Sequence, residues 1–376
     1  MVALVPILKK SYWALAGLGG LWALLLACSI HPTLQRHLVY MHKIHHGYFQ
    51  NVMNPEEFGF AKGQVTPFWL DTSDGEKLFC WHVLPLDVYL DNEVEITTTG
   101  GEGVADDFSS TLAAKLLKKD AKKTGLITDS ISIVSYVLHE LKQPSSRIVL
   151  FGQSLGTAVT AATALYFTDP DSPHLPSDIV RPAPTFQVPQ SFAGVVLAAA
   201  FTDLPELLKT YKIKGIVPVL SPLQHYPKIA GFLTSKILDR WATLARLQAL
   251  LTATTKTSTT LHLTILHARN DQEFTFQIAE TVYSPLESIM LAEEGATSVE
   301  ERRSIHGGER VKRGAFAYRK VETSNGERSV ELEVVRSSAV AFSYLSIVMI
   351  DYADKLKQFR MNELDFSSGW PQIWTN

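Results

Sequence analysis

The sequence predicts an α/β fold, because short β-branched segments alternate with helical segments along most of its 376 residues. Residues 147–151, RIVLF, form an apolar run bounded by turn residues, which predicts a buried strand. An alanine-rich helix follows at 157–167, and further apolar strands are expected at 194–198 and 261–267. Strands that alternate with helices pair mostly in parallel, in a sheet covered by helices on both faces.

The overall composition excludes several classes of function. A net charge of −3 and a pI near 6.5 give no electrostatic reason to expect nucleic acid. The chain contains no P-loop, no dinucleotide-binding glycine fingerprint and no internal repeat. Its two cysteines, Cys28 and Cys80, are too few for a zinc site and are not expected to form a structural disulfide. We therefore predict neither a metal nor a cofactor.

The first 31 residues are predicted to be a membrane anchor. Residues 12–30, YWALAGLGGLWALLLACSI, carry no charge, and a helix of that length rises about 28 Å, close to the thickness of a bilayer core. Lys9 and Lys10 precede this run, and Tyr12 and Trp13 stand where interfacial aromatic residues gather. A cleaved signal peptide and a buried globular helix are the alternatives. The favoured prediction is a single-pass membrane protein.

Beyond the anchor, residues 32–64 are interpreted as a connecting segment. The histidines at 42, 45 and 46 in this segment are interpreted as a face beside the membrane, in preference to a metal site. Residues 65–336 are predicted to form one α/β domain. Residues 337–376 are an atypical C-terminal tail, apolar at first and then polar, that does not fit a helix covering the sheet.

The first part of the α/β domain is predicted to begin with a hairpin. Its strands are 66–72 and 77–84, joined by a Ser-Asp-Gly turn. The Asp-, Thr- and Gly-rich residues 86–108 predict a loop, and the lysine-rich residues 110–123 predict a helix. Apolar residues at three- and four-residue steps predict an amphipathic helix at 127–141.

The second part contains one irregular region and one insertion. Residues 205–257 are predicted to be a largely helical, lid-like region. A helix is expected at 276–291, broken or kinked at Pro285. A charged insert at 293–328 then precedes the last predicted strand, 330–335.

The segment Gly152-Gln153-Ser154-Leu155-Gly156 is a G-x-S-x-G motif between a predicted strand and a predicted helix, the context of a nucleophile elbow. The sharp turn holds the serine in a strained conformation that small neighbours tolerate, which explains Gly152 and Gly156. It presents the Ser154 hydroxyl at the carboxyl edge of the sheet. There the N–H of Leu155 points towards a developing oxyanion.

With this motif in view, the chain resembles the membrane-anchored α/β-hydrolase domain proteins of the lysophospholipase and monoacylglycerol-lipase type. The resemblance implies an α/β-hydrolase fold, a serine esterase activity on lipid-like esters, and a location in the endoplasmic reticulum or another endomembrane. The matching stretches are NPEEFGF (54–60), WLDTSDGEKLFCWHVLP (69–85), GLITDSISIVSYV (125–137), RIVLFGQSLGTAVTAA (147–162), VVLAAAFTDLPEL (195–207) and LHLTILHARND (261–271).

A serine nucleophile needs a base, and the base needs an acid that orients it. The chain order in this fold is serine, acid, histidine. Asp271, in HARND after the strand ending at His267, stands where the family's motif places its aspartate. Asp203 is the rival acid, but an aspartate two residues before a proline is more simply a helix N-cap.

The base is the weak point of the resemblance. The family places its histidine after the last strand, and this chain has no histidine after His306, which lies in the charged insert before that strand. His306 is the candidate base, and a solvated loop residue is the alternative. His267 is interpreted as a structural residue at a strand end, and His82 as part of the hairpin.

A second departure lies between residues 84 and 126. The family places two strands there, with an HGNAG-like oxyanion loop and a D-Y-R-G-like turn, and neither motif is present. Loss of one oxyanion donor typically costs about 10²–10³ in rate. A non-catalytic, membrane-tethered binding or scaffold protein is therefore the alternative to a hydrolase. A degenerate paralogue or an incomplete reading frame would explain both departures.

Overall fold

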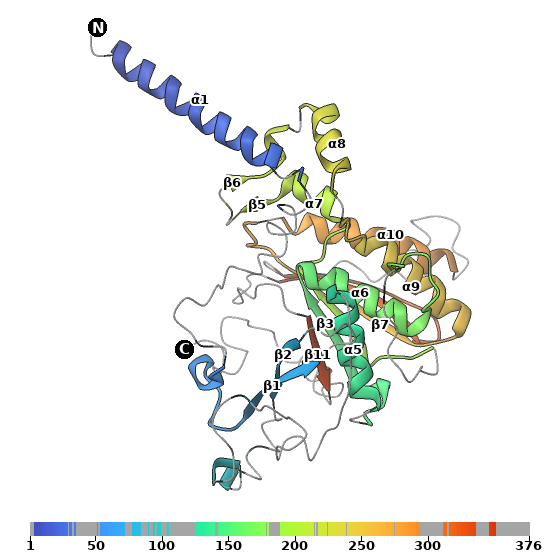
Figure 1. The fold of residues 1–376 in the computed structure, drawn as a ribbon. Helices are drawn as coiled ribbons and strands as arrows, with labels where there is room; N and C mark the ends of the chain where they lie inside the picture. Colours follow the sequence, from blue (N-terminus) through green and yellow to red (C-terminus); the bar gives the residue numbers. More distant parts are fainter. Residues whose placement is uncertain are drawn as a thin grey trace.

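A computed structural model describes residues within 4–34, 51–71, 77–104, 125–179, 189–293, 311–335 and 346–350, with gaps inside several of these ranges. A seven-stranded sheet forms the centre of the molecule, and helices pack against it (Figure 1). The predicted α/β class is therefore confirmed. The predicted helix at 110–123 and the histidines at 42, 45 and 46 lie outside the described residues.

The central sheet is parallel in its middle and antiparallel at its edges. Strands β3, β4, β7 and β10 pair in parallel, whereas β11, β9 and β8 add antiparallel pairings at the two sides. From edge to edge the order is β11 (Ser346–Ile350), β3 (Ile148–Gln153), β4 (Gly194–Ala198), β7 (Leu261–Ala268), β10 (Arg328–Val335), β9 (Phe316–Glu322) and β8 (Val311–Arg313).

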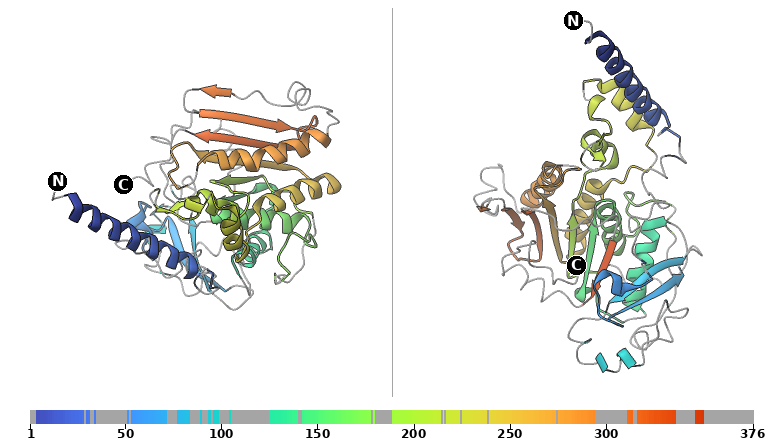
Figure 2. Two further views of the ribbon diagram at one scale, coloured as in Figure 1. Left: turned by 90° about the horizontal axis from the view of Figure 1, so that it is seen from above. Right: turned by 90° about the vertical axis from the view of Figure 1, so that its left-hand side faces the viewer.

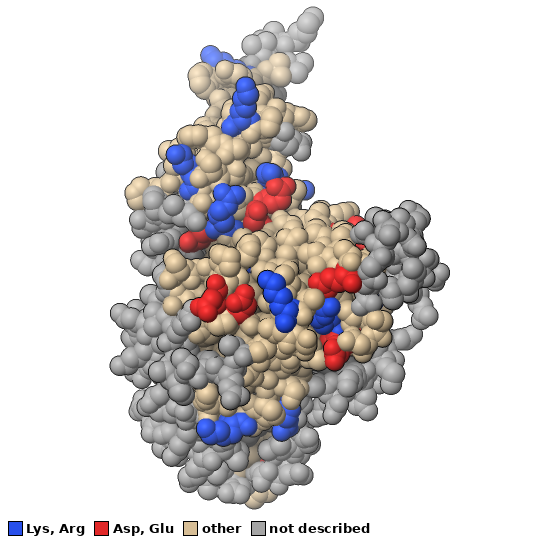
Figure 3. All heavy atoms as spheres, turned by 90° about the vertical axis from the view of Figure 1, so that its right-hand side faces the viewer, with Lys and Arg blue, Asp and Glu red and all other residues tan. Residues whose placement is uncertain are grey.

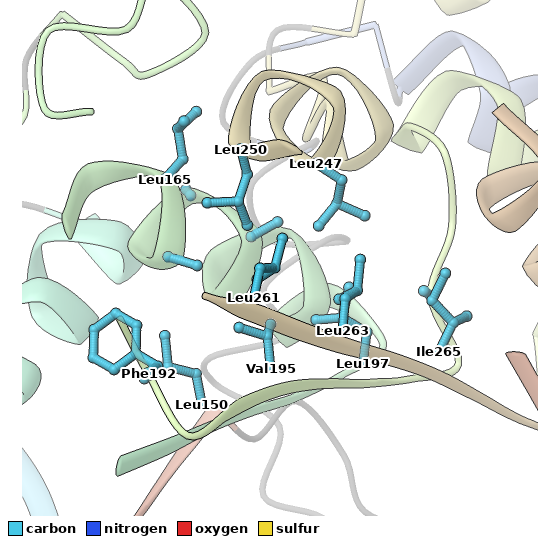
Figure 4. Packing of buried hydrophobic residues seen from close by; sticks show 14 of the residues in the cluster. Leu150, Leu165, Phe192, Val195, Leu197, Leu247, Leu250, Leu261, Leu263 and Ile265 are labelled. Atoms are coloured by element: carbon cyan, nitrogen blue, oxygen red, sulfur yellow. The ribbon is translucent and has the colours of Figure 1, made fainter. Parts of the chain in front are cut away.

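Four helices pack beside one another along the sheet in the order α5 (Gly125–His139), α6 (Leu155–Thr168), α9 (Thr243–Thr257) and α10 (Gln277–Glu293). Helix α6 lies over β3 and β4, and α10 lies over β7, β9 and β10. Apolar side chains of the parallel strands meet Leu165 of α6 and Leu247 and Leu250 of α9 (Figure 4). Burial of these side chains is the main force that fixes α6 over the sheet.

The predicted hairpin before the central sheet is confirmed. Strand β1 (Val65–Asp71) pairs antiparallel with β2 (Lys77–Val83), after the short 3-10 helix η1 (Pro55–Phe58). Phe68 and Leu70 of β1 belong to the main core cluster, so the hairpin is packed onto the α/β domain.

The lid-like region at 205–257 is largely helical, as predicted, and it also contains a small hairpin. It contains α7 (Leu204–Thr210), a small hairpin of β5 (Lys212–Ile213) and β6 (Val217–Pro218), the 3-10 turn η4 (Ser221–Leu223) and α8 (Pro227–Ser235). Helix α9, which was included in this region, instead belongs to the layer that covers the sheet. Its buried Leu247, Leu250 and Leu251 explain the difference, because they complete the core rather than a separate lid.

Helix α1 (Leu4–Cys28) extends from the body and meets the rest of the molecule at its C-terminal end, beside α8 and β6 (Figures 1 and 2). The helix begins earlier than the apolar run at 12–30 from which it was predicted. Among the described residues, no helix combines the length and apolar character needed to cross a bilayer.

The charged insert at 293–328 contains two strands that were not predicted, β8 and β9. Charged side chains on these strands interrupt the apolar pattern from which strands are predicted. Lys320 of β9 lies 3.5 Å from Glu331 of β10, and Arg319 pairs with Glu287 of α10. Such pairs allow charged residues on strands at the side of a sheet, where a simple apolar alternation is not required.

The atypical C-terminal tail was predicted to be separate from the α/β domain at 65–336, but residues 346–350 belong to the central sheet of that domain. Strand β11 pairs antiparallel with β3, with Ser346 opposite Gly152 and Ile350 opposite Ile148. It therefore covers the backbone edge of β3, which an unpaired strand would leave open to association with another chain.

Two smaller predictions are refined. Helix α10 was predicted to break or kink at Pro285, and it continues through Pro285 without a break, although a proline inside a helix costs about 3 kcal/mol. The buried Tyr283, Leu286 and Met290 pack this helix on the sheet and offset that cost. Within the predicted loop 86–108, the described residues 93–94 and 96–98 are helical.

Candidate active site

The predicted strand, turn and helix around Ser154 are present. Strand β3 ends at Gln153, α6 begins at Leu155, and Ser154 joins them with φ 51° and ψ −121°. Its N–H donates a hydrogen bond to the carbonyl oxygen of Ala198 at 2.9 Å, which ties the turn to β4. The side chain is half-buried. Ser154 thus stands at a tight bend on the carboxyl edge of the parallel strands.

Gly152 is required by a close approach of backbone. A Cβ atom at this position would lie 2.3 Å from the carbonyl oxygen of Gly156 and 2.4 Å from Oγ1 of Thr160. Both atoms belong to α6, so any side chain at 152 would push the helix away from β3. The two glycines of the motif therefore allow the strand and the helix to cross at the bend.

The N-terminus of α6 is the feature that could stabilise negative charge. Leu155 is its first residue, and the N–H groups of a first helical turn have no acceptor inside the helix. The Ser154 side chain makes no capping hydrogen bond to the helix, so its hydroxyl is not used to end the helix. The Leu155 side chain is buried with Ala158, Phe201 and Leu207, which fixes the first turn.

Asp271 lies in the loop after β7, as expected. Its Oδ1 accepts a hydrogen bond from the Glu273 N–H at 2.9 Å, and its Oδ2 lies 3.5 Å from Nε2 of His267. The Asp271 side chain is 19% exposed, whereas the His267 side chain is fully buried. These contacts hold the carboxylate in one orientation at the carboxyl end of β7.

The register of the sheet relates Ser154 to this loop. Gln153 of β3 is opposite Ala198 of β4, which in turn is opposite Leu266 of β7. Ser154 and His267 therefore stand at the same level, two strand spacings apart, which is about 10 Å. A third group is needed to connect the acid of β7 with the serine of β3.

Of the other two candidates, His306 and Asp203, the structure describes only Asp203. His306 lies outside the described residues, so its position relative to Ser154 stays a prediction. Asp203 is the N-cap of α7, where its Oδ1 accepts the Glu206 N–H at 2.8 Å. The alternative interpretation of Asp203 as a cap is confirmed, and this hydrogen bond explains the residue without catalysis.

One residue that positions the elbow helix was not predicted. Arg246 of α9 donates from Nη1 to the carbonyl oxygen of Ala158 in α6 and from Nε to that of His174, both at 3.2 Å. Burial lowers the pKa of its guanidinium to about 10, well below the usual range. The available signal was a single charged residue on a helix face whose other residues are uncharged.

Two further observations concern the part of the chain that the structure describes. Its His, Cys, Asp and Glu side chains form no cluster of three that would hold a metal. An open hollow lined by Leu138, His139, Pro144 and Gln190 lies beside the start of β3, at the opposite end from Ser154. The chemistry available at the carboxyl edge is that of a hydroxyl, a helix N-terminus and an oriented carboxylate.

Comparison with known proteins adds no relative: no family model matches the chain, and no curated protein matches it. The roles of Ser154, Leu155 and Asp271 therefore depend on the geometry given above.

Proposed function

We propose that the chain is a serine hydrolase that cleaves carboxylic esters of lipid-like substrates through an acyl-enzyme on Ser154. The observation that carries this proposal is the backbone of Ser154, which has a positive φ at the junction of β3 and α6. A residue other than glycine rarely adopts such a conformation, and strained residues of this kind cluster at functional sites.

In the proposed reaction, Oγ of Ser154 attacks the ester carbonyl carbon and loses its proton to a histidine base. The negative oxygen that forms is stabilised by the Leu155 N–H. The base returns the proton to the leaving alcohol, and the acyl group stays on Ser154 until water, activated by the same base, releases it as a carboxylic acid. His306 is the proposed base, and Asp271 is the proposed acid that orients it.

Lipid-like substrates and a membrane location are part of the same proposal. Helix α1 exposes a long series of apolar side chains, and it meets the body beside α8, near the segment that packs on Leu155. Such a helix would hold the enzyme at a lipid surface, in agreement with the endomembrane location that the family resemblance implies.

A fluorophosphonate probe tests the proposal, because it reacts with an activated serine hydroxyl. The full-length protein should be labelled, and Ser154→Ala should abolish labelling. Ser146→Ala is the matched control, because Ser146 is exposed on η3 (Ser145–Arg147) at the opposite end of β3. Equal labelling of wild type and Ser154→Ala would refute the proposal.

A non-catalytic binding protein is the second candidate, and one observation favours it. The histidine that contacts Asp271 is His267, whose side chain is fully buried and therefore closed to a substrate. This candidate predicts no ester turnover, with partner binding unchanged in Ser154→Ala. Ester turnover that disappears in Ser154→Ala would exclude it.

A further inference from the structure

Helix α8 turns an apolar face away from the molecule. Tyr226, Ile229 and Phe232 are 59%, 50% and 56% exposed, and they recur at steps of three residues, so they share one side of the helix. Ala230 and Thr234 occupy the buried side. Two large exposed apolar side chains on a helix of nine residues, with a third on its N-cap, exceed what a surface in water requires.

Helix α1 is attached beside this face. The Trp22 indole N–H donates to the carbonyl oxygen of Val219 at 3.2 Å. Trp22 and Leu26 also pack against the cluster formed by Leu220, Leu223 and Ala230, the last of which is on α8 itself. Helix α1 therefore runs close to α8 (Figure 2), and it too exposes apolar side chains, including Trp13, Leu18 and Leu21.

The charge of these two segments differs from that of the rest of the chain. Residues 1–55 and 207–238 contain nine Lys and Arg and no Asp or Glu, whereas the other 289 residues contain 26 basic and 38 acidic residues. In Figure 3 the charged side chains nearest the tip of the molecule are basic, whereas acidic and basic side chains are mixed on the body. On α8, Lys236 lies over the Phe232 ring at 5.3 Å from its centroid.

An apolar face bordered by lysines is the composition of a helix that lies at the surface of a membrane with anionic lipids. The apolar side chains enter the acyl boundary, and the lysine ammonium groups reach the headgroups. A protein partner would more often meet such a patch with matched polar groups around its border. The absence of carboxylates along 207–238 favours a uniformly anionic partner.

We propose that the outward face of α8 inserts into the headgroup region of an anionic phospholipid bilayer, beside α1. This inference rests on the proposed function. Insertion of α8 would bring the carboxyl edge of the sheet, where Ser154 lies, towards lipid. Leu208 of α7 joins the two sites physically, since it packs both on the cluster around Leu155 and on the cluster under α8.

A polarity-sensitive fluorophore attached to α8 tests the inference. The full-length chain with Cys28→Ser and Cys80→Ala receives Ile229→Cys, is labelled with nitrobenzoxadiazole, and is mixed with phosphatidylcholine vesicles with or without phosphatidylserine. We expect a blue shift and a several-fold rise in emission with phosphatidylserine, and quenching by nitroxide-labelled lipid. Lys228→Glu should weaken the response. Thr252→Cys, exposed on α9, is the matched control and should not respond.

The outcomes separate this inference from the proposed function. An unchanged fluorophore on anionic vesicles overturns the inference even if Ser154 is labelled by fluorophosphonate. A blue shift in a protein that fluorophosphonate does not label supports the inference and refutes the hydrolase. A shift that appears without vesicles and grows with protein concentration overturns it, because a second copy of the chain would then cover α8.

Discussion

At the scale of single residues, the backbone geometry at Ser154 is costly, and the proposed role of its hydroxyl as a nucleophile would account for it. A residue other than glycine in a sparsely populated backbone region costs about 1–3 kcal/mol. Ser154 has φ 51° and ψ −121° while its side chain makes no capping hydrogen bond to α6. Glycine would adopt the same turn with less backbone strain. The feature that serine adds at this position is its hydroxyl.

Ser154→Gly should therefore stabilise the protein relative to Ser154→Ala. Both variants lose the hydroxyl, but only glycine adopts a positive φ without strain. We expect the free energy of unfolding to be about 1 kcal/mol higher for Ser154→Gly than for Ser154→Ala. Urea unfolding followed by circular dichroism measures the difference, and a less stable glycine variant would contradict the assigned strain.

Gly152→Ala should destabilise the protein because the new methyl group meets the backbone of Gly156. Such overpacking typically costs about 1–3 kcal/mol. Gly231→Ala is the matched control, since a Cβ there meets nothing within 4 Å on the exposed helix α8. The control should be neutral or stabilised by up to about 1 kcal/mol. Equal thermal unfolding of the two variants would show that β3 and α6 are not in close contact.

His82 on β2 predicts how stability depends on pH. Burial lowers the pKa of its imidazole from 6.5 to about 4. Below about pH 6.5 the unfolded chain therefore binds a proton that the folded chain excludes. The free energy of unfolding consequently decreases as the pH is lowered from about 6.5 to about 4. The loss at about pH 5 is at most about 2 kcal/mol.

His82→Gln should remove this part of the acid sensitivity, because glutamine does not titrate. Urea unfolding midpoints at about pH 7.5 and about pH 5 measure it. We expect the drop between these two values to be smaller in the variant than in the wild type. If the midpoint dropped equally in His82→Gln and in the wild type, groups other than His82 would cause the pH dependence.

At the scale of elements, the position of α6 depends on contacts from α9 as well as on β3. Arg246 bonds the carbonyl oxygens of Ala158 and His174 from a buried position. A buried guanidinium that donates to two carbonyl groups is costly to remove, because both carbonyl oxygens then lose a charged donor in a place closed to water. The helix that presents Leu155 is therefore held from both sides.

Arg246→Met should lower the free energy of unfolding by about 1–3 kcal/mol while keeping most of the side-chain volume. We also expect slower fluorophosphonate labelling of Ser154, because the N-terminus of α6 is less firmly placed. Lys256→Ala, at the exposed C-terminal end of α9, is the control and should leave both measurements unchanged. If Arg246→Met were as stable as the wild type and were labelled normally, Arg246 of α9 would not help to position the turn at Ser154.

Elements with a strong local signal were predictable from the sequence. RIVLF before the motif and LHLTILH before Asp271 became β3 and β7, because short apolar runs between turns require a buried strand. Strands β9 and β11 were missed for opposite reasons. The charges of β9 conceal its alternation, and β11 is defined by pairing with β3, some 200 residues earlier in the chain, which no local pattern encodes.

At the scale of the whole molecule, the parallel strands bring together groups that are distant in sequence. Ser154 and Asp271 were predicted as partners from motif and chain order, and the sheet places both at its carboxyl edge. The contact between Asp271 and His267 was not predicted, because a strand-end histidine has no distinctive sequence pattern. His306 lies outside the described residues, so its role as base is a prediction that chemistry must test.

The most direct test is to locate a covalent adduct. After reaction of the full-length protein with a fluorophosphonate, trypsin digestion and mass spectrometry should place the phosphonate on Ser154, in the peptide that begins at Ile148. His306→Ala and Asp271→Asn should reduce the adduct strongly. Absence of an adduct on a folded protein, or an adduct on a different serine, would contradict a hydrolase that uses the hydroxyl at the bend between β3 and α6.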